Sequence, residues 1–213
     1  KQFSEAQSRA ILIFQAISIQ QSISSSPKAA IRTLEKRYET HPNEREALKE
    51  IISLAKKIES SKIKLLKQVL KEVKKEQAVI FCLRKATAEE LKRILDKEFG
   101  KSEVYSGDVS SPSKRKKILE EFKEGKIQYL VATDAAAEGL NLQHCNILFN
   151  YDLHWNPMKI EQRIGRVHRF GQEKDVTIFN LCVKDTIDDY VLHVLFQKID
   201  LFTMTIGGME TIL

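Results

Sequence analysis

The sequence predicts an α/β fold in which a mostly parallel sheet carries helices on both faces and follows a helical subdomain. From residue 76 onward, short apolar runs alternate with amphipathic helical patterns, as expected of right-handed β-α-β crossovers. Before that point the periodicity is helical, with no strand-like run. These two observations predict a helical, basic segment over residues 1–75, an α/β domain over 76–202 and a truncated continuation over 203–213.

Three helices are expected in the first segment. Apolar residues at helical spacing predict the first helix over 3–23. Ser26, followed at once by a proline, gives an N-cap for a second helix over 27–39. Asn43, with a glutamate three residues later, has the spacing of a capping box and predicts a third, long helix that reaches about residue 75.

The second part alternates strands and helices. Its strands are continuous apolar runs, which is typical of strands buried on both faces. The strands are expected at 78–83, 103–107, 127–133, 147–152 and 175–183. The helices are expected at 87–99, at 111–125, from about 158 onward and at 186–202. In such sheets, binding sites form from the loops at the carboxyl ends of the strands.

Composition narrows the classes of function. The formal net charge is +6, and residues 1–77 hold 16 lysines and arginines against 9 acidic residues. A basic segment favours a polyanionic partner, although a solvated helical face shows the same excess. No apolar run approaches the ~18–20 residues that span a bilayer, so no membrane partner is expected. No signal peptide is visible, and the missing initiator methionine indicates an excised piece of a longer polypeptide.

The three cysteines, Cys82, Cys145 and Cys182, are widely spaced. Cys82 and Cys182 lie in apolar, strand-like runs, which predicts reduced core thiols of an intracellular protein. His144 and Cys145 are adjacent, and neighbouring residues rarely ligate one metal ion. No metal site is therefore expected.

The stretch EQRIGRVHRFGQ (161–172) carries three arginines, Arg163, Arg166 and Arg169, in steps of three. On a helix each step of three drifts by about 60°, so the three side chains are predicted to share about one third of the circumference. Like charges so placed become favourable when an anion lies beside them, and the guanidinium fork suits phosphate oxygens. The alternative is an exposed helix whose arginines pair with neighbouring acids such as Glu161.

The segment 151–172 resembles motif VI and its lead-in in superfamily 2 nucleic-acid motors, and most closely those of the Swi2/Snf2 family. Trp-Asn-Pro at 155–157 stands at the family's distance from a group of matching residues. They are Gln162, Arg166, His168, Arg169, Gly171 and Gln172. The string EQRIGR is similar to the branch that includes the bacterial RNA-polymerase-recycling ATPase.

A second stretch, VATDAAAEGLNLQ (131–143), resembles motif V of the same branch. A strand that ends in Thr133 and Asp134 before a small-residue turn presents backbone N–H groups suited to phosphate. Residues 78–95 resemble motif IV, and 105–122 resemble the family's Gly…Arg…Phe segment, in which either Lys114 or Arg115 fills the arginine position. The resemblance spans about 76–202 and implies the second RecA-like lobe, the helicase C-terminal lobe, of such a motor.

The resemblance implies roles for particular residues. Arg166 and Arg169 would be catalytic arginine fingers that reach across a cleft to the γ-phosphate of ATP, and Gln162 would couple the site to lobe movement. Nucleotide contacts are expected from Asp134, Gly139 and Asn141. Contacts with the nucleic-acid backbone are expected from Thr133, Ala135, Arg84, Lys85, Trp155 and Arg163. Trp155 is equally suited to a core position.

The expected cofactor is ATP with Mg²⁺, held mainly by the first lobe. This chain has no phosphate loop of its own, because its one candidate, Gly100–Ser102, lacks the required earlier glycine and precedes a strand. The expected partners are the double-stranded DNA backbone and the first RecA-like lobe of the same polypeptide. RNA polymerase or another DNA-bound complex is a further candidate partner.

Three functions remain open from the sequence. The chain is the second lobe of a Swi2/Snf2-type translocase on double-stranded DNA, the same lobe of a strand-separating DNA or RNA helicase, or a non-enzymatic basic nucleic-acid-binding module. The spacing of Trp-Asn-Pro and His-Arg-Phe-Gly-Gln favours the first. A cytoplasmic, nucleoid-associated prokaryotic protein is expected, or a nuclear one if the source is eukaryotic.

Overall fold

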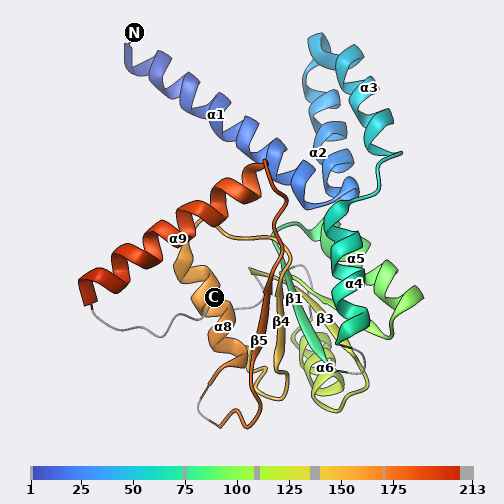
Figure 1. Ribbon diagram of the computed structural model, residues 1–213. Coiled ribbons are helices and arrows are strands. Elements are labelled where there is room, and N and C mark those ends of the chain that lie inside the picture. Colours follow the sequence, from blue (N-terminus) through green and yellow to red (C-terminus); the bar gives the residue numbers. More distant parts are fainter. Residues whose placement is uncertain (1, 74–75, 108–110, 135–139, 170, 207–213) are drawn as a thin grey trace.

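Figure 1 shows the computed structural model, whose backbone is described over residues 2–73, 76–107, 111–134, 140–169 and 171–206. Side chains are described within residues 9–198 of that set. The described part contains a five-stranded sheet in the order β2-β3-β1-β4-β5, and every neighbouring pair is parallel. The strands are β1 (Ala78–Cys82), β2 (Ser102–Tyr105), β3 (Tyr129–Thr133), β4 (Ile147–Asn150) and β5 (Thr177–Asn180). The predicted parallel sheet is confirmed.

Helices cover both faces of this sheet. On one face, α4 (Ser61–Glu72) and α5 (Lys85–Glu98) share a core cluster with alternate residues of β1, β3 and β4. On the other face, α6 (Pro112–Lys123) packs on the remaining residues of those strands, together with the end of α8 (Pro157–Val167). Because both faces are covered, every residue of β1, β3 and β4 is buried, which explains their continuous apolar sequences.

The helical segment rises from the carboxyl end of the sheet (Figure 1). It contains α1 (Gln2–Ser25), α2 (Pro27–Thr40), the short 3-10 turn η1 (Pro42–Glu44) and α3 (Arg45–Ala55). The predicted cap at Ser26 is confirmed, because its hydroxyl accepts a hydrogen bond from the backbone N–H of Ala29 at 3.2 Å. The last helix, α9 (Ile187–Ile206), contacts both α1 and α8.

The prediction of one helix from Asn43 to about residue 75 is wrong. The chain breaks between α3 and α4, where Ser60 is extended and its hydroxyl accepts a hydrogen bond from the N–H of Ile63 at 3.3 Å. Asn43 is not a cap either, since it lies inside η1 and Glu44 occupies the N-cap position of α3 without a side-chain bond. A serine cap can start a new helix without any glycine or proline before it.

Helix α4 bears on the predicted domain boundary at residue 76. Its buried residues Ile63, Leu66 and Leu70 belong to the same core cluster as β1. Packing therefore favours a boundary near residue 60, between α3 and α4, and the division at 76 stays a prediction.

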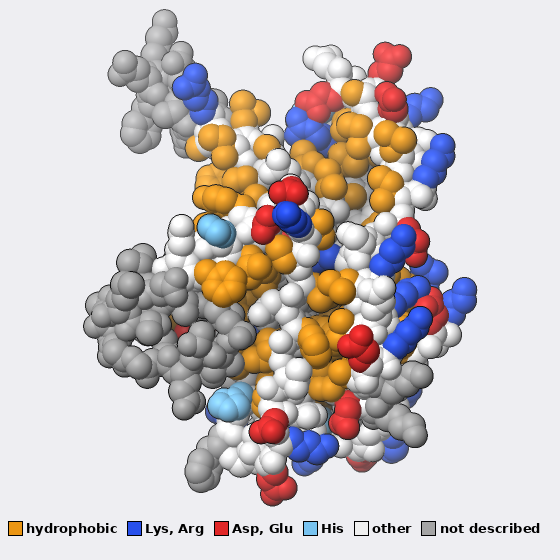
Figure 2. All heavy atoms as spheres, in the orientation of Figure 1, with side chains coloured by type: hydrophobic (Ala, Val, Ile, Leu, Met, Phe, Trp, Pro, Cys, Tyr) orange, Lys and Arg blue, Asp and Glu red, His pale blue; other side chains and the backbone are white. Residues whose placement is uncertain are grey.

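Apolar side chains gather over the helical segment (Figure 2). On α1 four consecutive residues, Ile11, Leu12, Ile13 and Phe14, are 53–71% exposed. Among the described residues, no helix combines the length and apolarity that crossing a bilayer requires.

The three cysteines are free thiols. Cys82 is buried, as the sequence predicts, and so is Cys145, whereas Cys182, also expected in the core, is only half-buried. Burial raises the pKa of Cys182 to about 11, with the carboxylates of Asp188 and Asp189 acting in the same direction.

Because the thiolate is the reactive form, iodoacetamide should label Cys182 slowly at pH 8, with a rate that rises about tenfold per pH unit until about pH 11. In urea the same thiol should react quickly at pH 8. Equally fast labelling of the folded chain at pH 8 would contradict this assignment.

Candidate functional site

Arg163 joins three strand ends to helix α8. Its Nε and Nη2 donate to the two carboxylate oxygens of Asp134, at 2.7 and 2.8 Å. Its Nη1 donates to Oδ1 of Asn150 at 2.9 Å and to the backbone carbonyl of Asp152 at 2.8 Å. The guanidinium also lies 5.3 Å from the centre of the Phe81 ring. A bidentate, charge-assisted pair of this kind fixes both distance and orientation, so α8 is held in register with the ends of β1, β3 and β4.

The three arginines do not share one exposed flank, and that premise of the sequence analysis is wrong. Arg163 is 2% exposed and points inward with Ile160 and Val167. Helix α8 ends at Val167, so Arg169 follows the helix and does not extend its face. The structure gives Arg163 a positioning role, and this geometry does not support its predicted contact with nucleic acid.

Arg166 and Arg169 are placed differently from Arg163. Arg166 is half-buried and Arg169 is exposed. Within the described part of the chain, neither guanidinium has a hydrogen-bond or ion-pair partner. Two permanently charged forks without a counter-ion suit an anionic ligand such as a phosphate chain.

The Trp-Asn-Pro sequence starts helix α8. Asn156 is the N-cap, and its Oδ1 accepts from the N–H of Met158 at 3.0 Å, while Pro157 occupies the first turn. Trp155 is half-buried and meets the ring of Tyr190 edge-on, with centroids 5.9 Å apart. Trp155 also packs against the cluster that Ile160 forms with α9. Its surroundings favour the core alternative.

The end of α8 is tied to the segment that resembles motif V. The backbone N–H of Leu142 donates to the carbonyl of Arg166 at 3.0 Å. The side-chain amide of Gln172 donates to the carbonyl oxygens of Gln143 at 2.8 Å, Val167 at 3.1 Å and Cys145 at 3.2 Å. Sequence reasoning gave Gln172 no role beyond its match to the pattern. The structure shows that its side-chain amide joins the motif VI segment to the loop after motif V by hydrogen bonds.

The other predicted residues of this region differ in exposure. Thr133 is the last residue of β3 and is 7% exposed. Asn141 and Gln162 are exposed, and the Asn141 side chain accepts a hydrogen bond from the N–H of Gln143 at 3.3 Å. Ala135 and Gly139 lie outside the described residues, so their predicted contacts stay predictions.

Arg84 and Lys85 lie at the start of α5, after β1. The Nη2 of Arg84 donates to the carbonyl and the hydroxyl of Ser18, both at 3.1 Å, and so joins α5 to α1. Its Nε is buried and has no partner among the described atoms. Lys85 is exposed. Their predicted contacts with nucleic acid stay predictions.

For the arginine position of the Gly…Arg…Phe segment, the structure favours Arg115 over Lys114. Its Nη2 donates to the carbonyl of Gly107 at 2.8 Å and so connects α6 with the chain after β2. Gly107 and Arg115 are the two residues that the Gly…Arg…Phe pattern places in relation to each other.

Burial lowers the pKa of His154. The positive charges of Arg163 and Lys159 also lower this pKa, whereas the carboxylate of Asp134 raises it, and the net shift is downward. A neutral imidazole fits its contact, because the ring Nδ1 accepts a hydrogen bond from the N–H of Asn156 at 2.9 Å. Among the described residues, no group of three or more His, Cys, Asp or Glu side chains is placed to hold a metal ion.

Replacing Gly165 in α8 with alanine should stabilise the chain by about 1 kcal/mol, since glycine is a poor helix former and an added Cβ would meet nothing within 4 Å. The melting temperature should rise by about 2–4 °C. The matched control is Gly171→Ala. Gly171 has φ +94°, a conformation that an L side chain disfavours, so this variant should melt lower. A lower melting temperature for Gly165→Ala would contradict the open surface at Gly165.

The parallel sheet and the joined motif V and VI segments define a RecA-like α/β lobe of a superfamily 2 helicase-like ATPase. Residues 61–171 match the helicase conserved C-terminal domain, and the chain belongs to this family.

Several relatives of this chain are named as helicases. An uncharacterised ATP-dependent helicase of Bacillus subtilis, YqhH, is 35% identical over 207 residues, which cover 94% of this chain and 37% of YqhH. The ATP-dependent RNA helicase RhlB of Shewanella amazonensis is 36% identical over 137 residues, which cover 62% of this chain and 31% of RhlB. The chain thus spans about a third of the length of these relatives.

Solved structures show the same fold. The C-terminal part of the Fun30 ATPase domain superposes with a TM-score of 0.60 at 27% identity, covering 64% of this chain and 46% of that one. The Hef helicase domain of Pyrococcus furiosus gives a TM-score of 0.59 at 25% identity, covering 78% of this chain and 38% of that one. The RecA-like fold is confirmed, and the branch within the superfamily stays a prediction.

Proposed function

We propose that this chain is the C-terminal motor lobe of an ATP-dependent translocase of Swi2/Snf2 type that moves on double-stranded DNA. The observation that carries the proposal is the way Arg163 clamps Asp134. This clamp brings the motif V and motif VI segments together and leaves Arg166 and Arg169 without partners in the described part of the chain.

In the proposed mechanism, the first lobe of the same polypeptide holds most of the nucleotide. Bound ATP with Mg²⁺ supplies the phosphoryl group whose transfer to water drives movement. Arg166 and Arg169 neutralise the negative charge that grows on the phosphates during transfer, and arginine fingers contribute about 10³–10⁵ in rate. Asn141 contacts the nucleotide, and Gln162 links the site to the closing of the lobes.

The nucleic-acid backbone is proposed to lie along the carboxyl ends of the strands. Thr133 and Ala135 with their backbone N–H groups, and Arg84 and Lys85 after β1, are the proposed contacts. Binding through phosphates is salt-dependent and largely independent of sequence. Two lobes that grip the backbone alternately would then walk along the duplex.

Two observations support the Swi2/Snf2 assignment, on which the proposed double-stranded DNA substrate rests. The first is the Trp-Asn-Pro to Gly-Gln spacing over 155–172, and the second is the likeness to Fun30. We further propose a cytoplasmic, nucleoid-associated protein of a prokaryote, with RNA polymerase or another DNA-bound complex as the object it moves.

A second candidate is the corresponding lobe of an RNA helicase. It is favoured by the relatives RhlB, at 36% identity, and CshA of Listeria monocytogenes, at 39% identity over 115 residues. Both are named as RNA helicases, and each matches about half to two thirds of this chain.

The test is the ATPase rate of the full-length protein with duplex DNA, single-stranded DNA, RNA or no nucleic acid. Stimulation by duplex DNA alone is the expected result. Stimulation by RNA or single strands would replace the translocase with the helicase. No ATP hydrolysis under any condition, together with salt-dependent DNA binding, would leave only the basic binding module.

A further inference from the structure

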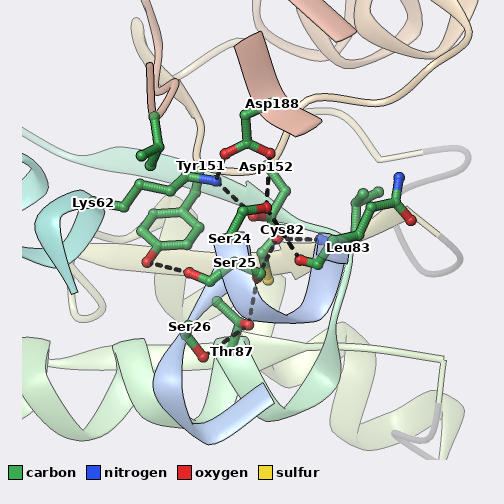
Figure 3. Close-up of polar contacts among 12 residues, drawn as sticks. Ser24, Ser25, Ser26, Lys62, Cys82, Leu83, Thr87, Tyr151, Asp152 and Asp188 are labelled. Carbon is green, nitrogen blue, oxygen red and sulfur yellow. Dashed lines mark hydrogen bonds and ion pairs between the residues drawn. The ribbon is translucent and has the colours of Figure 1, made fainter. Parts of the chain in front are cut away.

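A buried cluster of charged and hydroxyl groups lies where the helical segment meets the sheet (Figure 3). At its centre the ammonium group of Lys62, a residue 1% exposed, lies 3.0 Å from Oδ1 of Asp152 and 2.8 Å from Oδ2 of Asp188. The ring of Tyr151 covers the ammonium group, with its centroid 4.9 Å away. Lys62 belongs to α4, Asp152 follows β4 and Asp188 begins α9, so one side chain joins three elements.

The serines at the α1–α2 corner complete this cluster. Ser25 donates to Oδ2 of Asp152 at 2.8 Å, and Ser24 donates to Oδ1 of Asp188 at 3.1 Å. The hydroxyl of Tyr151 donates to the carbonyl of Ser25 at 2.8 Å. The corner therefore rests on the same two carboxylates that Lys62 binds.

Asp152 connects this cluster to the candidate site. Its carboxylate binds Lys62, Ser25 and the backbone N–H of Leu83, the last at 2.9 Å. Its own backbone carbonyl accepts the hydrogen bond from Arg163 at 2.8 Å, and Arg163 clamps Asp134. A continuous path of polar contacts thus runs from the helical segment, through Asp152 and Arg163, to Asp134 directly after β3.

The buried cluster is ionic, because Lys62 keeps its positive charge between two carboxylates. Burial lowers the pKa of Lys62, but attraction to Asp152 and Asp188 outweighs it, so the net pKa is raised and the charge is kept. Well-packed apolar residues often stabilise a fold as well as a buried ion pair does. A directional ion pair instead restricts the relative placement of the elements it joins. The main contribution of this cluster is therefore to orient the elements that it joins, and its contribution to the stability of the fold is smaller.

We propose that Lys62 and Ser25 are positioning residues that set the geometry of the ATP site through Asp152 and Arg163. The inference rests on the proposed function. In that arrangement the helical segment connects the two lobes, and the cluster passes its orientation to the motif V and VI segments. Displacing Asp152 moves Arg163 and hence Asp134, directly after β3, and the helix that carries Arg166.

The test uses the full-length protein and a pair of matched double variants. Lys62→Met/Asp188→Asn removes one positive and one negative charge from the cluster and keeps both side-chain shapes. The control, Lys67→Met/Glu98→Gln, makes the same change of charge at an ion pair between α4 and α5, where Lys67 lies 2.6 Å from Glu98, and does not touch Asp152. A third variant, Ser25→Ala, removes one hydrogen bond to Asp152 and leaves the ion pairs in place.

The readouts are the kcat and KM of nucleic-acid-stimulated ATP hydrolysis and the melting temperature. Small misplacements of catalytic groups reduce chemistry by up to about 100-fold. We expect kcat to fall at least tenfold in Lys62→Met/Asp188→Asn and about threefold in Ser25→Ala, with KM for ATP within twofold of wild type. The control should keep the wild-type kcat.

The outcomes separate this inference from the proposed function. Wild-type kcat in a folded Lys62→Met/Asp188→Asn protein would overturn the inference while the stimulated ATPase of the wild type still stands. If that variant does not fold, Ser25→Ala decides, and a wild-type kcat there would overturn the inference in the same way. An equal fall in the control variant would also overturn it. A wild-type protein without stimulated ATPase activity would remove the proposed function itself.

Discussion

Replacing Arg169 with alanine should lower the kcat of stimulated ATP hydrolysis in the full-length protein by about 10³-fold or more, the range for loss of an arginine finger. Arg169 is exposed just after α8 and has no partner in the described part of the chain. The reason for the large effect is that its charge matters most when negative charge grows on the phosphates. The measurement is steady-state ATPase activity with saturating nucleic acid.

Two properties should stay unchanged in this variant. The melting temperature should match the wild type, because the side chain makes no described contact within the lobe. Affinity for nucleic acid without nucleotide should also be kept, since the proposed backbone contacts lie elsewhere. An Arg169→Ala protein with wild-type kcat would remove Arg169 from the catalytic machinery.

Replacing Arg163 with alanine should instead destabilise the lobe. Arg163 is 2% exposed, and its loss leaves the Asp134 carboxylate, the Asn150 amide and the Asp152 carbonyl without their shared donor. Breaking a buried pair by removing one partner costs about 3–5 kcal/mol. Because the Asp134 side chain is 20% exposed and can regain some hydration, the low end is expected. A loss of about 3 kcal/mol lowers the melting temperature by about 6–12 °C.

The matched control for this prediction is Arg166→Ala, one turn further along α8. Arg166 has no side-chain partner in the described part of the chain, so its removal should change stability by at most about 0.5–1 kcal/mol. The two variants are compared by urea or thermal unfolding of the 213-residue chain. Equal stabilities for Arg163→Ala and Arg166→Ala would show that the Asp134 clamp does not hold the lobe together.

Most of the sheet could be predicted from the sequence, because strands buried on both faces must be apolar at every position. That rule identified β1, β3 and β4 at once. The split between α3 and α4 could not be predicted, because α3 ends at Ala55 and α4 starts after its Ser60 cap with no glycine or proline between them. The apolar spacing continues across the break, so periodicity alone reports one long helix.

The sequence predicted which residues form the site, but it did not predict which of them contact each other. The spacing of motif residues identified Arg163, but its partner Asp134 is 29 residues away in the chain, and local spacing contains no information on such pairs. A signal was present nonetheless. Arg163 lies three residues after Ile160 and four before Val167, which is the spacing of an inward-facing stripe. An arginine on an apolar stripe predicts a buried carboxylate nearby.

The buried cluster around Lys62 was missed for a similar reason. Lys62 belongs to a helix rich in lysine, in which Lys64, Lys67 and Lys71 are also present. Only the fold shows that Lys62 faces Asp152 and Asp188, which are 90 and 126 residues away. Charge counted along a sequence cannot separate a buried lysine from a solvated one.

Trp155 gives this chain a built-in optical reporter. It is the one tryptophan in the sequence, and it packs edge-on to Tyr190 where α8 meets α9. The fluorescence emission of an indole ring shifts to longer wavelength when water reaches the ring. A separation of α9 from α8 should therefore shift the emission maximum of Trp155. In the 213-residue chain, a separation of α9 from α8 can therefore be followed by fluorescence without attaching a dye.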